Sequence, residues 1–241
     1  MAYRVETVQV KGSPMEVFLF DPKGPGPHPG LVLCQHIPGH TGIDKDPFTL
    51  KTGERYAENG YAVSVPFLYH WWPKEADMQV KREEFRDDWT APDLRAGFDV
   101  LAAQKNVDAG RIGIAGHCWG GRVCWLGACT DSRYKACAVF YGGGVKEVRG
   151  KGNPPAIELA GKIPCPVIGF FGNDDTNPSP KDVDDYEAAL KKAGVEYAFH
   201  RYDGAGHAFQ WADNPERYRE KASEDAWEKV LAFFAEKLKK K

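Results

Sequence analysis

The chain has 241 residues, of which 42% are hydrophobic and 27% charged, and its formal net charge is −2. This balance gives no indication of a nucleic-acid partner, and no apolar run approaches the ~20 residues needed to span a bilayer. A chain of this length can bury a large core, and α/β folds of this size are often one domain, so we expect a single domain over residues 1–241.

Periodicity and turn signals predict strands that alternate with helices along the chain. Alternating residues indicate an opening antiparallel pair, and short apolar runs indicate buried strands. The predicted strands are residues 4–10, 15–20, 30–34, 62–66, 111–115, 136–141, 166–171 and 196–202. The predicted helices are residues 50–58, 91–104 with Pro92 in the first turn, one after residue 118, 180–193 and 214–238. This order implies an α/β fold, a mostly parallel sheet with helices on both faces and ligands at the carboxyl ends of the strands.

Residues 116–121 read Gly-His-Cys-Trp-Gly-Gly, directly after the predicted strand 111–115. A strand, a Gly-x-nucleophile-x-Gly turn and a helix start are typical of a nucleophile elbow, with Cys118 at its tip. The small neighbours are needed because the turn is tight. The helix N-terminus beneath the thiol favours its thiolate form.

A thiol nucleophile needs a base, and the base needs an orienting partner. His207 follows the strand 196–202 and Asp175 follows the strand 166–171, so both lie at predicted carboxyl ends. The order nucleophile, acid, histidine is that of α/β-hydrolase triads. Asp174 competes with Asp175 for the acid's place. Backbone N–H groups of Trp119 and Ile37 are the expected oxyanion donors, since Pro38 has no N–H.

Together these motifs resemble the dienelactone hydrolase (carboxymethylenebutenolidase) family of α/β-hydrolases. The similarity covers essentially the full chain and rests on Gly-x-Cys-x-Gly-Gly at 116–121, Gln-x-Ile-x-Gly at 35–39, Gly-x-x-Asp at 172–175 and Ala-Gly-His-x-Phe at 205–209. The resemblance implies that Cys118, Asp175 and His207 form the triad and that Ile37 and Trp119 supply the oxyanion donors.

Two positions depart from the family pattern. His36 stands where the well-studied members carry a Glu that keeps the resting thiol protonated. His36 either raises the thiolate fraction, acts as a second proton acceptor, or only hydrogen-bonds its own loop. Trp211 stands where those members have an Arg that pairs with the substrate carboxylate, a geometry that an indole cannot reproduce. Arg82 and Arg86 are candidate substitutes, although such charge runs are usually solvated helix faces.

The aromatic segment after residue 66 is a candidate pocket wall. Tyr69, Trp72 and Trp211 either line an apolar pocket or simply cover the core. The charged segment 73–89 is a candidate lid. No HExxH motif or Cys/His cluster has metal-ligand spacing, so we expect neither a metal nor another cofactor.

Residues 1–7 lack the apolar segment of a signal peptide, and the six cysteines show no CxxC spacing. We therefore expect a cytoplasmic protein with mostly buried, reduced thiols, present as a monomer or small homo-oligomer, with no nucleic-acid or membrane partner. The predicted function is hydrolysis of a small lactone or carboxylic ester through a Cys118 acyl-enzyme. The alternative is a thiol-based redox or binding protein on the same fold, without turnover.

Overall fold

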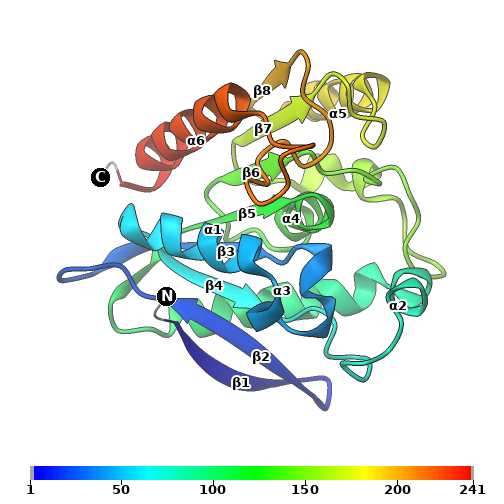
Figure 1. The fold of residues 1–241 in the computed structure, drawn as a ribbon. Coiled ribbons are helices and arrows are strands. Elements are labelled where there is room, and N and C mark those ends of the chain that lie inside the picture. The colour runs from blue at the N-terminus through cyan, green and yellow to red at the C-terminus, as the bar shows by residue number, and fades with distance from the viewer. Residues whose placement is uncertain (1–2, 240–241) are drawn as a thin grey trace.

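The computed structural model describes residues 3–239 and contains an eight-stranded sheet (Figure 1). The strand order is β1-β2-β4-β3-β5-β6-β7-β8. The strands are β1 (Arg4–Val10), β2 (Ser13–Phe20), β3 (His28–Cys34), β4 (Ala62–Pro66), β5 (Val107–His117), β6 (Cys137–Phe140), β7 (Val167–Gly172) and β8 (Tyr197–Tyr202). The β1–β2 and β2–β4 pairs are antiparallel, and the other five neighbouring pairs are parallel. The mostly parallel sheet predicted from the sequence is confirmed.

Helices cover both faces of the sheet (Figure 1). They are α1 (Pro47–Glu58), α2 (Met78–Glu84), α3 (Asp87–Ala102), α4 (Trp119–Thr130), α5 (Pro180–Ala193) and α6 (Glu220–Phe234). On one face, Tyr56 of α1 packs against Trp227 and Phe234 of α6. On the other face, α3 and α4 pack against each other. No helix within residues 3–239 is both long enough and apolar enough to cross a membrane.

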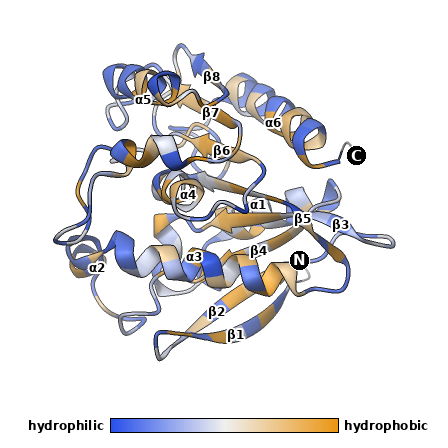
Figure 2. Cartoon of the chain, turned by 180° about the vertical axis from the view of Figure 1, so that it is seen from behind, coloured by the Kyte–Doolittle hydropathy of each residue, from blue (hydrophilic) through white to orange (hydrophobic). Residues whose placement is uncertain are grey.

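The central strands are buried on both sides, as their continuous apolar runs require. Every residue of β4, β6 and β7 is buried, and these strands are largely hydrophobic in Figure 2. The edge strand β1 instead alternates between exposed and less exposed positions. The hydrophobic core therefore lies between the sheet and its helices. The polar side chains of Asp175 and His207 lie in loops that follow β7 and β8.

The helix predicted at 91–104 begins earlier, at Asp87, so Pro92 lies inside it rather than in its first turn. Proline has no N–H, and the carbonyl group four residues back, that of Asp88, loses its helical partner. The Nζ of Lys11 donates a hydrogen bond to this carbonyl oxygen at 3.3 Å. The β1–β2 turn thus satisfies the group that the proline leaves free.

The closing helix is shorter than the prediction of 214–238. Residues before Glu220 form turns, in which the N–H groups of Arg217 and Tyr218 donate to the carbonyl oxygen of Asn214. The N–H of Arg219 then donates to the carbonyl oxygen of Phe209, which ties the segment back to an earlier loop. This tertiary hydrogen bond takes the place of a further helical turn. After Phe234 the helix ends in a π-helical turn, Ala235–Lys239.

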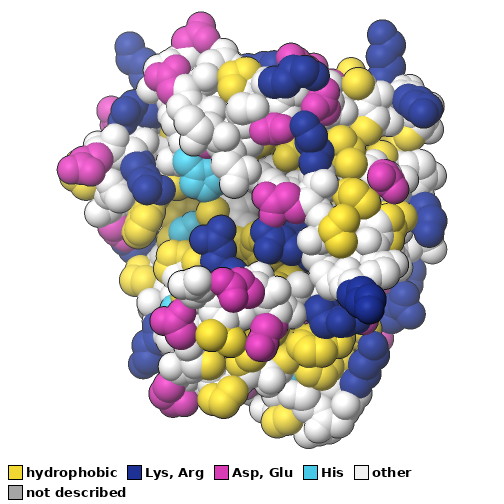
Figure 3. Space-filling model, turned by 90° about the vertical axis from the view of Figure 1, so that its right-hand side faces the viewer, with side chains coloured by type: hydrophobic (Ala, Val, Ile, Leu, Met, Phe, Trp, Pro, Cys, Tyr) yellow, Lys and Arg dark blue, Asp and Glu magenta, His cyan; other side chains and the backbone are white. Residues whose placement is uncertain are grey.

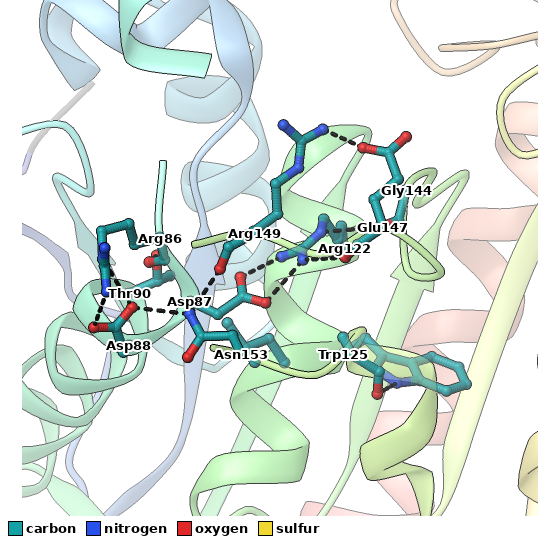
Figure 4. A network of polar contacts seen from close by, with 12 residues as sticks. Arg86, Asp87, Asp88, Thr90, Arg122, Trp125, Gly144, Glu147, Arg149 and Asn153 are labelled. Atoms are coloured by element: carbon teal, nitrogen blue, oxygen red, sulfur yellow. Dashed lines mark hydrogen bonds and ion pairs between the residues drawn. The ribbon is translucent and has the colours of Figure 1, made fainter. Parts of the chain in front are cut away.

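A buried ion pair joins the start of α3 to α4 (Figure 4). The guanidinium of Arg122, fully buried, donates to both carboxylate oxygens of Asp87 at 2.7 and 2.9 Å. Arg122 also donates to the carbonyl oxygens of Gly144 and Glu147. The N–H of Asp87 donates to the carbonyl oxygen of Arg149. The loop after β6 is therefore fastened to both helices.

Replacing Arg122 by alanine should lower the free energy of unfolding by about 3–5 kcal/mol, because the Asp87 carboxylate would stay buried without a partner. Urea unfolding followed by circular dichroism measures this change. Lys181→Ala, which removes an exposed pair with Asp185, is the matched control and should change stability by less than about 0.5 kcal/mol. Equal effects of the two substitutions would contradict a stabilising role for the buried pair.

Candidate active site

Cys118 lies at a strained turn between β5 and α4. Its φ of 56° and ψ of −122° place it in the half of backbone space that non-glycine residues rarely adopt. Such a conformation costs on the order of 1–3 kcal/mol and persists only where the surroundings impose it. The N–H of Cys118 donates to the carbonyl oxygen of Phe140, and its carbonyl oxygen accepts from Gly121. The predicted elbow geometry is therefore present.

Two glycines make this turn sterically possible. A Cβ at Gly116 would lie 2.0 Å from the carbonyl oxygen of Gly120. A Cβ at Gly120 would lie 2.4 Å from the carbonyl oxygen of Cys34, at the end of the neighbouring strand β3. Real Cβ atoms do not approach backbone oxygen this closely. Glycine is needed at these two positions because the backbone of β5 packs directly against that of α4, and the backbone of α4 against that of β3.

The structure brings Cys118, His207 and Asp175 together in a chain of hydrogen bonds. The Nε2 of His207 is 3.0 Å from the Sγ of Cys118, and its Nδ1 is 2.8 Å from the Oδ2 of Asp175. The second oxygen of Asp175 accepts a hydrogen bond from the N–H of Asn177 at 2.9 Å. Asp175 is buried, whereas its competitor Asp174 is exposed. The geometry therefore selects Asp175 as the partner of His207.

The electrostatics of the site favour a thiolate. Burial raises the pKa of Cys118, but hydrogen bonds from His207 and His36 outweigh this effect and bring the pKa to about 6. Burial lowers the pKa of His207, but its hydrogen bonds to Asp175 and Cys118 raise it to about 10. Between these two values the proton resides on His207 and the charge on the sulfur.

Cys118 opens into a cleft of about 340 Å³. The residues lining it are Ile37, Arg82, Cys118, Trp119, Gly143, Gly144, Glu147, Arg149, Asp175, Thr176, Asn177, His207 and Arg217. Ile37 begins a 3-10 helix (Ile37–Thr41) and Trp119 begins α4, so their N–H groups have no partner within those helices. Ile37 and Trp119 therefore line the cleft together with Cys118, each with a backbone N–H that its own helix does not use.

The predicted aromatic residues do not line this cleft. Tyr69 is completely buried, and Trp72 donates its indole N–H to Glu84. Trp211 meets the ring of His36 edge-on, with ring centres 6.0 Å apart, and lines a different depression. These rings cover the core beneath the loops, because burying large apolar surface is more favourable than lining a polar cleft.

Of the two predicted arginines, only Arg82 lines the cleft. Arg86 is held outside it, because its guanidinium pairs with Asp88 and lies over the ring of Trp89.

Two further arginines of the cleft, Arg149 and Arg217, were not predicted from the sequence. Arg149 comes from the loop after β6, and Arg217 from the turns mistaken for the start of the closing helix. Histidine and basic side chains border a hollow on this face of the molecule (Figure 3).

The other cysteines form a distinct class. Cys34, Cys124, Cys129, Cys137 and Cys165 are all buried and free, as predicted. Burial raises the thiol pKa of four of them, Cys34, Cys124, Cys129 and Cys165. The pKa of the Cys137 thiol is raised first by a hydrogen bond with Cys124 and then by burial. Within residues 3–239, no group of three His, Cys, Asp or Glu side chains is arranged to hold a metal ion.

Comparison with known proteins places these features in context. The sequence profile of the dienelactone hydrolase family matches residues 15–238. A Synechocystis protein provisionally named carboxymethylenebutenolidase is 31% identical over 92% of both chains. An Escherichia coli protein with the same provisional name is 28% identical over 95% of this chain and 84% of its own. A crystal structure from Klebsiella pneumoniae, provisionally named dienelactone hydrolase, superimposes with a TM-score of 0.83 at 29% identity, covering 98% and 99% of the two chains.

The rate of Cys118 alkylation by iodoacetamide should rise with pH with a midpoint near 6, because the reactive thiolate forms above its pKa. Mass spectrometry of the modified protein measures this rate. Cys118→Ala is the control, and it should remove the fast reaction because the five remaining thiols are buried. A midpoint near 8.5, the value of an ordinary thiol, would contradict the thiolate assignment.

Proposed function

The chain belongs to the dienelactone hydrolase family, and from this premise we propose that it hydrolyses a small lactone or carboxylic ester through a thioester on Cys118. The observation that carries the proposal is the hydrogen-bonded chain from Cys118 through His207 to Asp175 at the wall of the cleft. A nucleophile, a base and an orienting acid in this order are the parts that acyl transfer needs.

In the first half of the reaction, the Cys118 thiolate attacks the carbonyl carbon of the substrate. The negative charge moves to the carbonyl oxygen, which accepts hydrogen bonds from the N–H groups of Ile37 and Trp119. The bond to the leaving oxygen then breaks, and His207 gives its Nε2 proton to that oxygen. In a lactone the released hydroxyl stays attached to the acyl chain.

In the second half, water hydrolyses the thioester. Neutral His207 takes a proton from water while the water oxygen bonds to the carbonyl carbon. The C–S bond then breaks with its electron pair on sulfur, which releases the carboxylic acid and restores the thiolate beside protonated His207. Asp175 keeps the imidazole in one orientation and stabilises its charged form.

The cleft also suggests the charge of the substrate. Among the described residues, the guanidinium groups of Arg82 and Arg217 have no hydrogen bond or ion pair, and both line the cleft. Arg149, which also lines the cleft, lies over the Trp119 ring and pairs with Glu147. We propose that the substrate carries a carboxylate, which these groups bind. Guanidinium groups suit this task because they match carboxylate geometry.

Cys118→Ala, His207→Ala and Asp175→Asn should each lower kcat/KM for an activated ester by about 10⁴-fold or more, because each removes a member of one catalytic unit. Hydrolysis of a panel of p-nitrophenyl esters and lactones measures this. Asp174→Asn, which changes the exposed neighbouring carboxylate, is the matched control and should keep nearly full activity. Absence of turnover in the wild type, with Cys118 still rapidly alkylated, would favour the thiol-based binding or redox function.

Arg82→Gln or Arg217→Gln should raise KM for an ester carrying a free carboxylate by about 10-fold or more, because one charge-assisted hydrogen bond is lost. The same variants should hydrolyse the matching uncharged ester like the wild type. Arg86→Gln is the control, since Arg86 lies outside the cleft and pairs with Asp88. Equal losses on both esters would refute carboxylate recognition and indicate a structural effect.

A further inference from the structure

A second histidine lies beside the nucleophile. Strands β3 and β5 are parallel neighbours, and Cys34 pairs in register with Gly116. Two residues beyond this pair the chains reach His36 and Cys118. The backbones approach closely here, because a Cβ at Gly120 would lie 2.9 Å from the carbonyl oxygen of Gln35. The sheet register thus brings an imidazole to the thiol from the strand next to the elbow.

His36 has a buried carboxylate of its own. Its side chain is 6% exposed, and its Nδ1 is 3.7 Å from the Oδ2 of Asp46, which is equally buried. This Nδ1 has no hydrogen-bond partner among the described residues. Asp46 is fixed because it accepts from the N–H of Phe48 and the hydroxyl of Thr49 at the start of α1. The pair is therefore poised to form a hydrogen bond when the imidazole is charged.

We propose that His36, oriented by Asp46, is a second catalytic histidine that stabilises the thiolate of Cys118 independently of His207. This inference rests on the proposed function, since it assigns a role in the same thioester chemistry. His36 holds its charge beside the sulfur throughout the cycle, whereas His207 carries the proton that moves between water, substrate and leaving group. The nucleophile thus has one imidazole for charge and another for proton transfer.

The groups around His36 support a charged imidazole. Those that face it are Asp46 before α1, Cys118 at the elbow, His117 at the end of β5, and the rings of Phe48 and Trp211. Burial lowers the pKa of His117 to about 3, so this neighbour is neutral. Burial also lowers the pKa of His36, but Asp46 and Cys118 outweigh it and raise the pKa to about 9.

The thiol itself is faced by His207, His36 and two buried phenols, Tyr69 and Tyr141. Burial raises the pKa of both phenols far above neutrality, so neither supplies a charge. Stabilising the thiolate makes sulfur a better leaving group and a weaker nucleophile. His36 therefore speeds the step in which the C–S bond of the thioester breaks, and the enzyme is suited to substrates with an activated acyl group.

The test measures thiolate formation by absorbance at 240 nm and by iodoacetamide alkylation across pH 4–10. His36→Asn should raise the midpoint by about one pH unit or more, the effect of losing one nearby opposite charge. His207→Asn should abolish ester turnover yet retain a midpoint below that of an ordinary thiol, because His36 remains. Only the double variant should titrate at or above the value of an ordinary thiol, because burial raises the pKa of Cys118 once both imidazoles are gone. His28→Asn, at the far end of β3, is the matched control and should leave the midpoint unchanged.

A kinetic measurement separates this role from a structural one. With a p-nitrophenyl ester, His36→Asn should show a rapid burst of p-nitrophenol followed by slow turnover, because the acyl-enzyme accumulates. A wild-type midpoint in folded His36→Asn, or an ordinary thiol in His207→Asn alone, would overturn the proposal. Because the alkylation readout needs no substrate, it remains decisive even if the wild type hydrolyses no ester, an outcome that would overturn only the proposed function.

Discussion

The strained backbone at Cys118 is the constraint on which the site depends. The turn holds the residue at a positive φ between β5 and α4, where Gly116 and Gly120 allow the backbone to pack against itself and against the end of β3. Ile37, just after β3, and Trp119, the first residue of α4, line the same cleft as Cys118. The turn also brings the segment after β3, and with it His36, to the sulfur. The geometry at this one turn therefore sets where Cys118 lies relative to the cleft and to the end of β3.

Much of this site could be predicted from the sequence, because its parts are local patterns at strand ends. Glycines around Cys118 signal a tight turn, and the polar loops holding Asp175 and His207 follow apolar strands. Parallel strands place such loops on one edge of the sheet. The fold was predictable for the same reason. The local pattern alone did not separate Asp175 from Asp174, since adjacent residues in a loop differ only in where each side chain points, and the choice of Asp175 came from the resemblance to the family.

The substrate-facing side chains were harder to predict, because tertiary contacts decide which of them reach the cleft. Trp72 and Trp211 look like pocket residues, but each finds a partner elsewhere, in Glu84 and in His36. Arg217 was hidden because its segment has helical periodicity, while one hydrogen bond from Arg219 to Phe209 holds it as a turn. Periodicity records what a segment favours alone, and not what the rest of the chain imposes.

The loop after β6, which brings Glu147 and Arg149 to the cleft, is anchored through its backbone. Arg122 holds this loop through the carbonyl oxygens of Gly144 and Glu147, and Asp87 holds it through that of Arg149. Backbone oxygens are common to all amino acids, so the anchor does not depend on which side chains the loop carries. Position 147 is therefore open to substitution without loss of this anchor, whereas the Arg149 side chain also lies over the ring of Trp119 at the start of α4 and donates to the carbonyl oxygen of Arg82. Substitution of Glu147 would thus change the wall of the cleft while the backbone of its loop stays in place.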